Sequence, residues 1–507
     1  MQEKRIMRDA VVLTAFSLVM RVGAILFSMY LTKAIGAQGV GLNQLTFSAF
    51  SFAVTVSTAG ISVAVTKILT EEYGRGMRFA DRAVMHAALC YALAVSAFAA
   101  AGVWLGADFI GNTLLRDART SAPLRLLSPA LVLMAASACF KGYLLAARRA
   151  SHIAVSDFLE QGVEVFGLVA LLSLFPTRDI GQACRYIAAA ITASELVSML
   201  YLAACYLHTR NRKTIRARRQ YLRRLLSVSL PVAASACLAS LLRTIENVSI
   251  PAGLVRAGLA REEALADYGA VRGMAIPVLF LPYAFLASFT SLAMPEVSES
   301  LAAQRPDQVR ALVRRVVRDC LMLAIPAAAA YLVWADALGQ GVYKSARVGQ
   351  VIFILAPLVP LMYFDAVADG ILKGMGEQTW VLKLNIVDSL LRIAMVFLLI
   401  PRFGFAGFMG LMYVSNIFNP LLSVARCMRL SGLRLDVRRW IAEPALCALA
   451  SALCLRALQE HFPHAVYAPL SLGAQIALFA LLYAGLLLIL RGGRDKKRSQ
   501  ETRIYEK

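Results

Sequence analysis

Several features that are common in enzymes and metalloproteins are missing from this 507-residue sequence. None of the nine cysteines forms a CxxC pair, and the five histidines show no metal-ligand spacing. No polar stretch between apolar segments is longer than about 25 residues, which leaves no room for a soluble catalytic domain. These absences argue against a metal site, a cofactor and an enzyme, and the cysteines are expected to be small buried hydrophobic residues.

Long apolar segments dominate the sequence instead. The chain is 59 % hydrophobic and only 17 % charged, with a mean hydropathy of +0.64. Windows of about twenty apolar residues recur from end to end, the length needed to cross a hydrocarbon core of about 30 Å. The sequence therefore predicts an all-α polytopic membrane protein. Its net charge of +22 is attributed to orientation in the bilayer, not to nucleic acid, because the basic residues fall between apolar segments.

We predict fourteen membrane-spanning helices, with both termini in the cytoplasm. The first apolar run carries Arg21 and has no small-residue cleavage site, so it is expected to be a retained span and not a signal peptide. With the N-terminus inside, 36 of the 53 Lys/Arg residues fall in inside loops and tails, 12 in outside loops and 5 in the membrane. The predicted spans lie near residues 11–32, 43–66, 84–106, 124–147, 153–175, 184–207, 226–250, 269–293, 316–335, 348–372, 380–400, 404–425, 440–458 and 468–490.

The basic segment 208–225 divides the chain into two halves. It must lie on the cytoplasmic face, where it sets the topology or holds anionic lipid headgroups. A shift of 228 residues across this segment aligns 127–144 with 355–372 at seven of eighteen positions, and also Gly41 with Gly269 and Glu160 with Asp388. Six spans on each side make the repeats parallel, as in two-lobed transporters whose site lies between the lobes. The predicted parts are an N-lobe 1–207, the linker 208–225, a C-lobe 226–430, two extra spans in 431–490 and a basic tail 491–507.

Several charged residues fall inside the predicted spans, where each costs several kcal/mol unless it is compensated. Helical spacing predicts three ion pairs. They join Arg243 to Glu246, Asp388 to Arg392, and Asp369 to Lys373.

Two further arginines, Arg21 and Arg272, have no partner at helical spacing. Asp157, Glu160 and Glu164 share one face of the fifth span, and Asp365 and Asp369 share a face of the tenth. The arginines either pair with these acidic faces or hold an anionic substrate. A guanidinium presents a planar fork of donors that matches phosphate oxygens. We favour Arg272 first and Arg21 second as residues that bind a pyrophosphate headgroup.

The order and spacing of loose motifs along nearly the whole chain resemble a known family. They are MRVGAILFSMYLTKAIGAQGVGLNQL (20–45), ISVAVTKILTEEYGRG (61–76), YGAVRGMAIPVLFLPYAFLASFTSLAMPEVSES (268–300) and LAPLVPLMYFDAVADGILKGMGEQ (355–378). They resemble the multidrug/oligosaccharidyl-lipid/polysaccharide (MOP) exporter superfamily, and within it the stage V sporulation protein B and MurJ-like lipid II flippase group. The resemblance implies a central cavity with arginines on spans one and eight, which match Arg21 and Arg272, and a groove for the lipid tail beside spans 13 and 14. The Arg-Asp pair common in the family after its first-span arginine is absent after Arg21, so the headgroup contacts need not be the same as in the family.

The resemblance implies a monomer that flips a lipid-linked oligosaccharide by alternating access, for cell-wall or spore-cortex synthesis. Membrane potential, Na⁺ or H⁺ could drive the cycle through the charges of the predicted spans. The coupling or cavity candidates are Glu160, Glu164, Asp365, Asp369, Asp388, Arg392, Arg243 and Glu246. A cation-coupled multidrug exporter of the same superfamily is the alternative; a membrane glycosyltransferase and a non-transporting scaffold are weaker ones.

Overall fold

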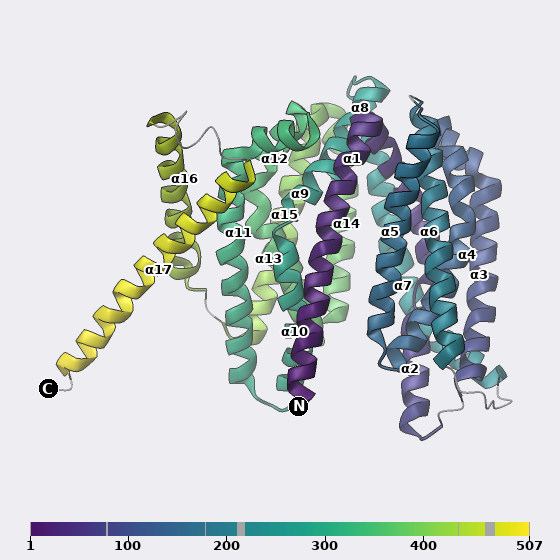
Figure 1. Cartoon of the computed structure of the whole chain (residues 1–507), viewed down its shortest axis with the longest axis horizontal. Coiled ribbons are helices and arrows are strands. Elements are labelled where there is room, and N and C mark those ends of the chain that lie inside the picture. Colours follow the sequence, from purple (N-terminus) through teal and green to yellow (C-terminus); the bar gives the residue numbers. More distant parts are fainter. Residues whose placement is uncertain are drawn as a thin grey trace. The chain divides into compact units, whose positions relative to one another are not determined.

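The computed structural model describes residues 2–77, 80–177, 179–209, 218–433, 435–461 and 472–505, with the backbone alone for 2–22, 24–25, 218–219, 288–295, 459–461 and 491–505. These residues are nearly all helical and include no strand (Figure 1). The chain forms two compact units, Met1–Gly273 with Ser389–Phe408, and Met274–Asp388 with Met409–Lys507. The predicted all-helical membrane fold is confirmed, whereas the predicted lobe boundaries stay a prediction.

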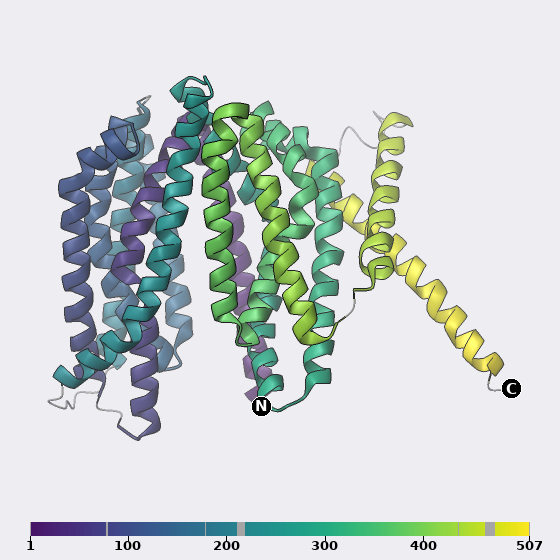
Figure 2. The same cartoon turned by 180° about the vertical axis from the view of Figure 1, so that it is seen from behind.

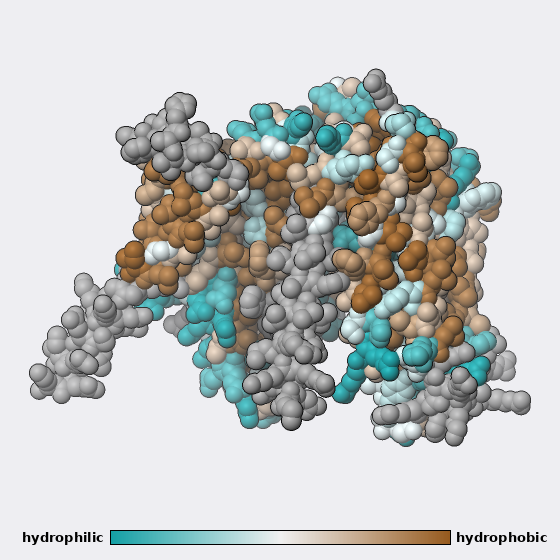
Figure 3. Space-filling view, in the orientation of Figure 1, coloured by the Kyte–Doolittle hydropathy of each residue, from teal (hydrophilic) through white to brown (hydrophobic). Residues whose placement is uncertain are grey.

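Ten of the described helical segments are long and apolar enough to cross a membrane. The predicted first and second spans share one of these segments, Leu26–Gly74, and the predicted fifth, eighth and eleventh spans are not among them. The count of fourteen therefore stays a prediction. On the face seen in Figure 3, hydrophobic side chains cover the middle of the helices, and hydrophilic ones gather toward their ends. Large side chains such as Phe98 and Phe166 are 84 % and 76 % exposed, as expected of a surface that faces lipid.

The first unit is built mainly from the first half of the sequence. Its first helix bends at Gly36, whose φ of 70° lies in the left-handed region that glycine adopts without a steric penalty. Its elements are α1 (Gln2–Thr58), α2 (Ile61–Gly74), α3 (Asp81–Phe109), the π-helical η1 (Ile110–Leu114), the 3₁₀ turn η2 (Ala118–Thr120), α4 (Ser121–Ala146), α5 (Ala150–Leu174), α6 (Ile180–Thr209), α7 (Arg218–Arg256), α8 (Arg261–Gly269), the beginning of η3 (Ala270–Ala275), and parts of α14 (Gln378–Leu398) and α15 (Ile400–Ser431).

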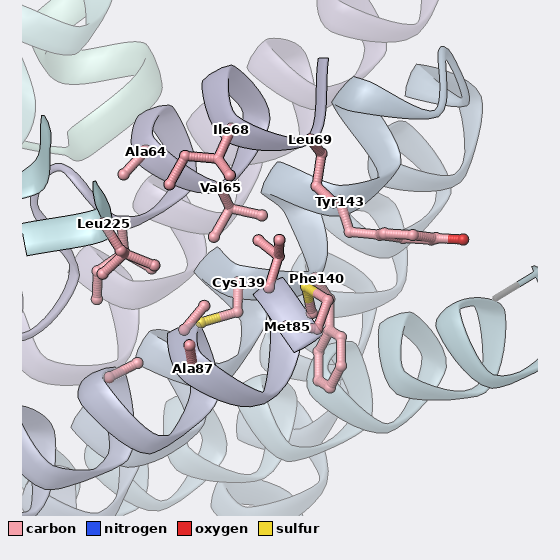
Figure 4. Close-up of a cluster of buried hydrophobic side chains, with 14 of the residues drawn as sticks. Ala64, Val65, Ile68, Leu69, Met85, Ala87, Cys139, Phe140, Tyr143 and Leu225 are labelled. Atoms are coloured by element: carbon pink, nitrogen blue, oxygen red, sulfur yellow. The ribbon is translucent and has the colours of Figure 1, made fainter. Parts of the chain in front are cut away.

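Small and branched apolar residues form the core of this unit. Ile68 and Val65 of α2, Met85 of α3 and Cys139 of α4 are each at most 1 % exposed and belong to one cluster (Figure 4). The Cys139 thiol lies among apolar side chains, as the sequence predicts for a structural cysteine. Alanines such as Ala88 and Ala135 let the helix backbones approach closely, which is the usual way of packing helices in a bilayer.

The second unit holds most of the C-terminal half. At its C-terminal end, α16 and α17 pack on α11 around Trp334, whose indole donates a hydrogen bond to Gln475 (3.1 Å), and they cross each other in both views (Figures 1 and 2). Its elements are the end of η3, α9 (Ile276–Leu279), α10 (Tyr283–Ala302), α11 (Pro306–Tyr343), α12 (Ala346–Leu355), the 3₁₀ turn η4 (Ala356–Leu358), α13 (Val359–Gly374), the remaining parts of α14 and α15, the π-helical η5 (Arg438–Ala442), α16 (Glu443–His461) and α17 (Leu472–Tyr505).

A proline breaks the helix between α9 and α10 in the second unit. Pro282 has no backbone N–H, so the carbonyl of Val278 loses its helical donor. The hydroxyl of Tyr331 donates to that carbonyl at 2.6 Å, and the hydroxyl of Tyr363 donates to the carbonyl of Leu279. Two buried tyrosines therefore donate to carbonyls at the break, and the Val278 carbonyl also accepts from the Leu281 N–H at 3.0 Å. These hydrogen bonds stabilise a bend inside the second unit.

Candidate functional site

Two arginines and a glutamate from three different elements meet in the first unit. Nη2 of Arg272 donates to Oε1 of Glu246 at 2.6 Å, and Nη2 of Arg392 lies 2.8 Å from the same oxygen. The Glu246 side chain is 3 % exposed, and those of Arg272 and Arg392 are 22 % and 20 % exposed. We call these three residues the arginine–glutamate cluster. Together the three side chains carry one net positive charge at a depth where charges are costly.

Close packing against α1 places Arg272. This arginine lies in the π-helical segment η3, and π-helical insertions frequently occur at functional sites. A Cβ on the next residue, Gly273, would lie 2.4 Å from Cγ1 of Val40, and Ser28 Oγ donates to the Gly273 carbonyl at 3.1 Å. Nε of Arg272 is buried and has no hydrogen-bond partner among the described atoms. The cluster therefore holds a donor that the protein itself does not use.

The predicted pairing of Arg243 with Glu246 is wrong. The exposed Arg243 directs Nε to the carbonyl of Ala239 on its own helix, at 3.3 Å. Glu246 pairs instead with Arg272 of η3 and Arg392 of α14, because the fold brings two guanidiniums to the buried face of α7. Arg272 lacks a partner at helical spacing, but it pairs with Glu246 on another helix, α7.

The carboxylates of the predicted acidic face on α5 contact side chains of α4 and α6. Lys141 of α4 lies 2.8 Å from Asp157, and Ser198 of α6 donates to Glu160 at 3.0 Å. Glu195 of α6 is 6 % exposed and lies close enough to Glu160 and Glu164 to interact with their charges. A group of acidic side chains with one lysine therefore lies where α5 packs against α4 and α6.

The acidic candidates of the second unit are more separate. Asp369 pairs with Lys373 at 3.5 Å, which confirms the predicted i,i+4 pair on α13. Asp388 is 5 % exposed and accepts hydrogen bonds from the Ser415 hydroxyl at 2.9 and 3.0 Å. Asp365 lies half-buried one turn before Asp369 on the same helix. The side chain of Arg21 lies outside the described residues, so its role stays a prediction.

The chemistry of these groups is that of binding and charge compensation. Within the described residues, no group of three or more His, Cys, Asp or Glu side chains has the geometry of a metal site. The groups that do converge are guanidiniums, carboxylates and hydroxyls at membrane depth. Such groups line substrate and ion pathways in membrane proteins. The fold and these charges define a polytopic helical membrane transporter.

Comparison with known families identifies the family of this chain. Residues 6–295 match the family model described as polysaccharide biosynthesis protein, and residues 263–398 match the MatE model. The chain belongs to the polysaccharide biosynthesis protein family. Its resemblance to the MOP exporter superfamily, and within it to the stage V sporulation protein B and MurJ-like group, is confirmed by the relatives and solved structures that it matches.

Individual relatives cover most of the chain at low identity. Stage V sporulation protein B of Bacillus subtilis is 24 % identical over 503 residues, 97 % of this chain and 96 % of that protein. Sporulation protein YkvU of the same organism is 20 % identical over 377 residues, 73 % of this chain and 83 % of its own. The fold is similar to lipid II flippase MurJ in an inward closed conformation, with a TM-score of 0.72, 11 % identity and coverage of 94 % and 98 %. It is also similar to an inward-facing multidrug resistance MATE family transporter, with a TM-score of 0.65, 15 % identity and coverage of 84 % and 100 %.

Two residues of the acidic group are not predicted from the sequence. Lys141 and Glu195 lie in apolar segments without a charged neighbour at helical spacing on their own helix. A signal existed for Lys141, because the 228-residue shift aligns it with Asp369. No comparable signal exists for Glu195, whose aligned position is Ser423.

Proposed function

We propose that this protein is a flippase that moves a lipid-linked oligosaccharide across the bacterial cytoplasmic membrane by alternating access. The substrate is a lipid II-type peptidoglycan precursor or a related undecaprenyl-linked sugar, used for cell-wall or spore-cortex synthesis. The observation that carries the proposal is the convergence of Arg272 and Arg392 on Glu246. A pyrophosphate matches the planar donor forks of two arginines far better than an organic cation does.

In the proposed cycle Glu246 acts as an internal anion that the substrate replaces. The pyrophosphate takes over guanidinium donors that Glu246 engages in the absence of substrate, and the unused Nε of Arg272 adds another donor. Arg21 is the second proposed headgroup residue. Rocking of the proposed lobes, 1–207 and 226–430, then exposes the headgroup to the other side of the membrane.

Coupling to the membrane potential, Na⁺ or H⁺ would reset the transporter, with no other cofactor. The proposed coupling residues are the carboxylates of the spans, above all Glu160 and Glu164 with their neighbour Glu195, and Asp365, Asp369 and Asp388. Moving one charge through the membrane field contributes about 2.3 kcal/mol per 100 mV, enough to bias a conformational step. The proposed orientation keeps both termini in the cytoplasm, and the proposed active form is a monomer.

Rescue of a bacterium depleted of its own lipid II flippase tests the proposal. Lipid II exposed on the outer leaflet is measured for wild type, Arg272→Ala and the control Arg125→Ala at matched membrane levels. Arg125 pairs with Asp108 at the surface, with side chains 43 % and 60 % exposed, so its loss should be neutral. We expect rescue by wild type and the control and none by Arg272→Ala. A well-expressed wild type that restores nothing would exclude lipid II, and the assay would pass to other undecaprenyl-linked sugars.

A cation-coupled multidrug exporter is the second candidate. The acidic group on α5 and α6 favours it, since buried carboxylates suit an organic cation or a coupling ion. Resistance of a drug-sensitive strain distinguishes the two functions. An exporter would lose resistance with Glu164→Gln and keep it with Arg272→Ala, whereas the proposed flippase would confer no resistance at all.

A further inference from the structure

A second charged feature lies at the end of the first unit where three predicted outside loops meet. It is a cleft of about 230 Å³ lined by apolar side chains and by two arginines. At about 30 Å³ per water, this volume accommodates a phosphate with the glycerol attached to it. The cleft is lined by Thr113, Leu114 and Arg116 after α3, by Val248, Ser249, Ala252, Gly253 and Arg256 of α7, and by Val396, Phe397 and Pro401 of α14 and α15.

The arginines at this cleft hold positive charge that no described carboxylate neutralises. Arg116 and Arg256 are exposed, and neither forms an ion pair with a described residue. Arg261 lies nearby and donates a hydrogen bond to the Leu115 carbonyl. Burial lowers the pKa of Arg261, Asp117 raises it, and the charges of Arg119 and Arg116 lower it further. Arg116 and Arg256 therefore present positive charge to the cleft without a described carboxylate partner, which favours binding of an anion.

The backbone of Arg116 is held in a conformation that glycine normally adopts. Its φ is 55°, in the left-handed region that costs a non-glycine residue roughly 1–2 kcal/mol. Residues held in such conformations cluster at ligand sites, where the side chain matters more than the strain. Here the residue with this backbone conformation is one of the two arginines that line the cleft.

The rim of the cleft is suited to acyl chains. Leu114 and Phe397 are each 50 % exposed, and both lie at helix ends near the predicted edge of the membrane. A ligand with a phosphate between Arg116 and Arg256 would therefore rest its apolar part on these side chains. Basic pockets between membrane helices bind anionic lipid headgroups in this way.

We propose that this cleft is a binding site for an anionic phospholipid, separate from the arginine–glutamate cluster that receives the transported substrate. The phosphate contacts Arg116 and Arg256, and the acyl chains lie along Leu114 and Phe397. Because Arg116 belongs to the first sequence repeat and Arg256 to the second, the lipid links segments of both repeats at their outside end. Bound lipid therefore stabilises this end of the protein against separation.

Purified full-length protein in nanodiscs tests the site. Discs of phosphatidylcholine alone are compared with discs that also contain phosphatidylglycerol, and lipid retained by the released protein is counted by native mass spectrometry. A double variant, Arg116→Gln combined with Arg256→Gln, removes both positive charges from the cleft. The matched control is Lys344→Gln with Arg185→Gln, because both residues are exposed at the predicted outside face and Lys344 has a similar φ of 52°.

We expect wild type and the control to retain phosphatidylglycerol and to melt at higher temperature in its presence. The double arginine variant should retain about tenfold less phosphatidylglycerol than wild type. Ala252→Phe, which fills the cleft without changing its charge, should lose it as well. Equal retention by either cleft variant and wild type would overturn the site. Equal stabilisation by soluble glycerol phosphate in phosphatidylcholine discs would overturn the lipid as its ligand.

Discussion

Gly41 of α1 and Gly269 of α8 are packed backbone to backbone. A Cβ on Gly41 would lie 1.8 Å from the carbonyl oxygen of Leu265, and a Cβ on Gly269 would lie 2.5 Å from the carbonyl oxygen of Ala37. The two contacts are reciprocal, because a shift of 228 residues carries Gly41 to Gly269 and Ala37 to Leu265. Reciprocal contacts between equivalent residues are expected at a two-fold axis. The crossing of α1 and α8 thus supports parallel repeats related by such an axis.

Alanine at either glycine should destabilise the protein. The atoms that an added Cβ would meet are backbone atoms, which cannot turn aside as a flexible side chain does. We expect Gly41→Ala and Gly269→Ala each to cost about 1–3 kcal/mol or more, seen as a lower thermal midpoint of the purified protein. Gly102→Ala is the control, because nothing lies within 4 Å of its added Cβ. A Gly41→Ala protein that melts like the control would contradict the close crossing.

Hydropathy predicts where the helices lie, but charges and bends within them leave the number of membrane-spanning helices open. The predicted fifth span is helical as α5, but Asp157, Glu160 and Glu164 make it too charged to qualify on composition alone. The bend at Gly36 leaves no mark on hydropathy either, since the run of apolar residues continues through it. Charge and kinks belong to the interior of a transporter, so the segments that matter most for function are those that hydropathy identifies least clearly.

The site was predictable only within single helices. Spacing identifies the Asp369–Lys373 pair, but it assigns Glu246 to Arg243 on the same helix when the partners of Glu246 come from η3 and α14. Long side chains on different helices reach one another only through the tertiary fold.

The two repeats keep their glycine crossing yet exchange charges at aligned positions. Lys141 of the first repeat aligns with Asp369 of the second, and Glu164 aligns with Arg392. The first predicted repeat therefore has a carboxylate at the position where the second supplies an arginine to Glu246. Under the proposed function, the second repeat would bind the anionic headgroup and the first the coupling cation.

Removing both arginines of the cluster should cost more than the sum of the single losses. Arg272→Ala leaves Glu246 paired with Arg392, and Arg392→Ala leaves it paired with Arg272. The double variant leaves a carboxylate that is 3 % exposed without either guanidinium, which is strongly destabilising. A double-mutant cycle compares the thermal midpoints of wild type, the two single variants and the double variant. Arg243→Ala serves as the control, and additive losses would mean that Glu246 does not depend on this pair.

Loss of the hydroxyl of Tyr363 should destabilise the bent segment around Pro282. The variant Tyr363→Phe leaves the Leu279 carbonyl, deep in the second unit, without this donor. An unsatisfied buried carbonyl costs about 1–3 kcal/mol, so the thermal midpoint should fall and amide exchange around the break should quicken. Tyr91→Phe is the matched control, because the Tyr91 hydroxyl makes no hydrogen bond within the described residues. Unchanged exchange in Tyr363→Phe would show that water or another donor satisfies the carbonyl.

Acid should weaken the loop between α3 and α4 through Asp117. Burial raises the pKa of this carboxyl, but the hydrogen bonds that it accepts from the Arg119 side chain, at 2.8 and 3.0 Å, and the charge of that arginine outweigh burial and leave the pKa below its ordinary value. A lowered folded-state pKa means that the carboxylate contributes stability above the unfolded pKa of about 3.9 and loses it as the pH falls through the folded value.

The difference in thermal midpoint between wild type and Asp117→Asn checks this sign. We expect a constant difference from pH 7 down to about pH 4, and a shrinking difference below it as wild type becomes protonated. Asp108→Asn is the control, since its pair with Arg125 is exposed and contributes little at any pH. A difference that grows on acidification would mean that Asp117 is stabilised in its neutral form. Its bonds to Arg119 would then not be those of an ion pair, and the stability of the loop would come from its other hydrogen bonds, such as those from Arg261 to the Leu115 carbonyl and from the Asp117 N–H to the Gly111 carbonyl.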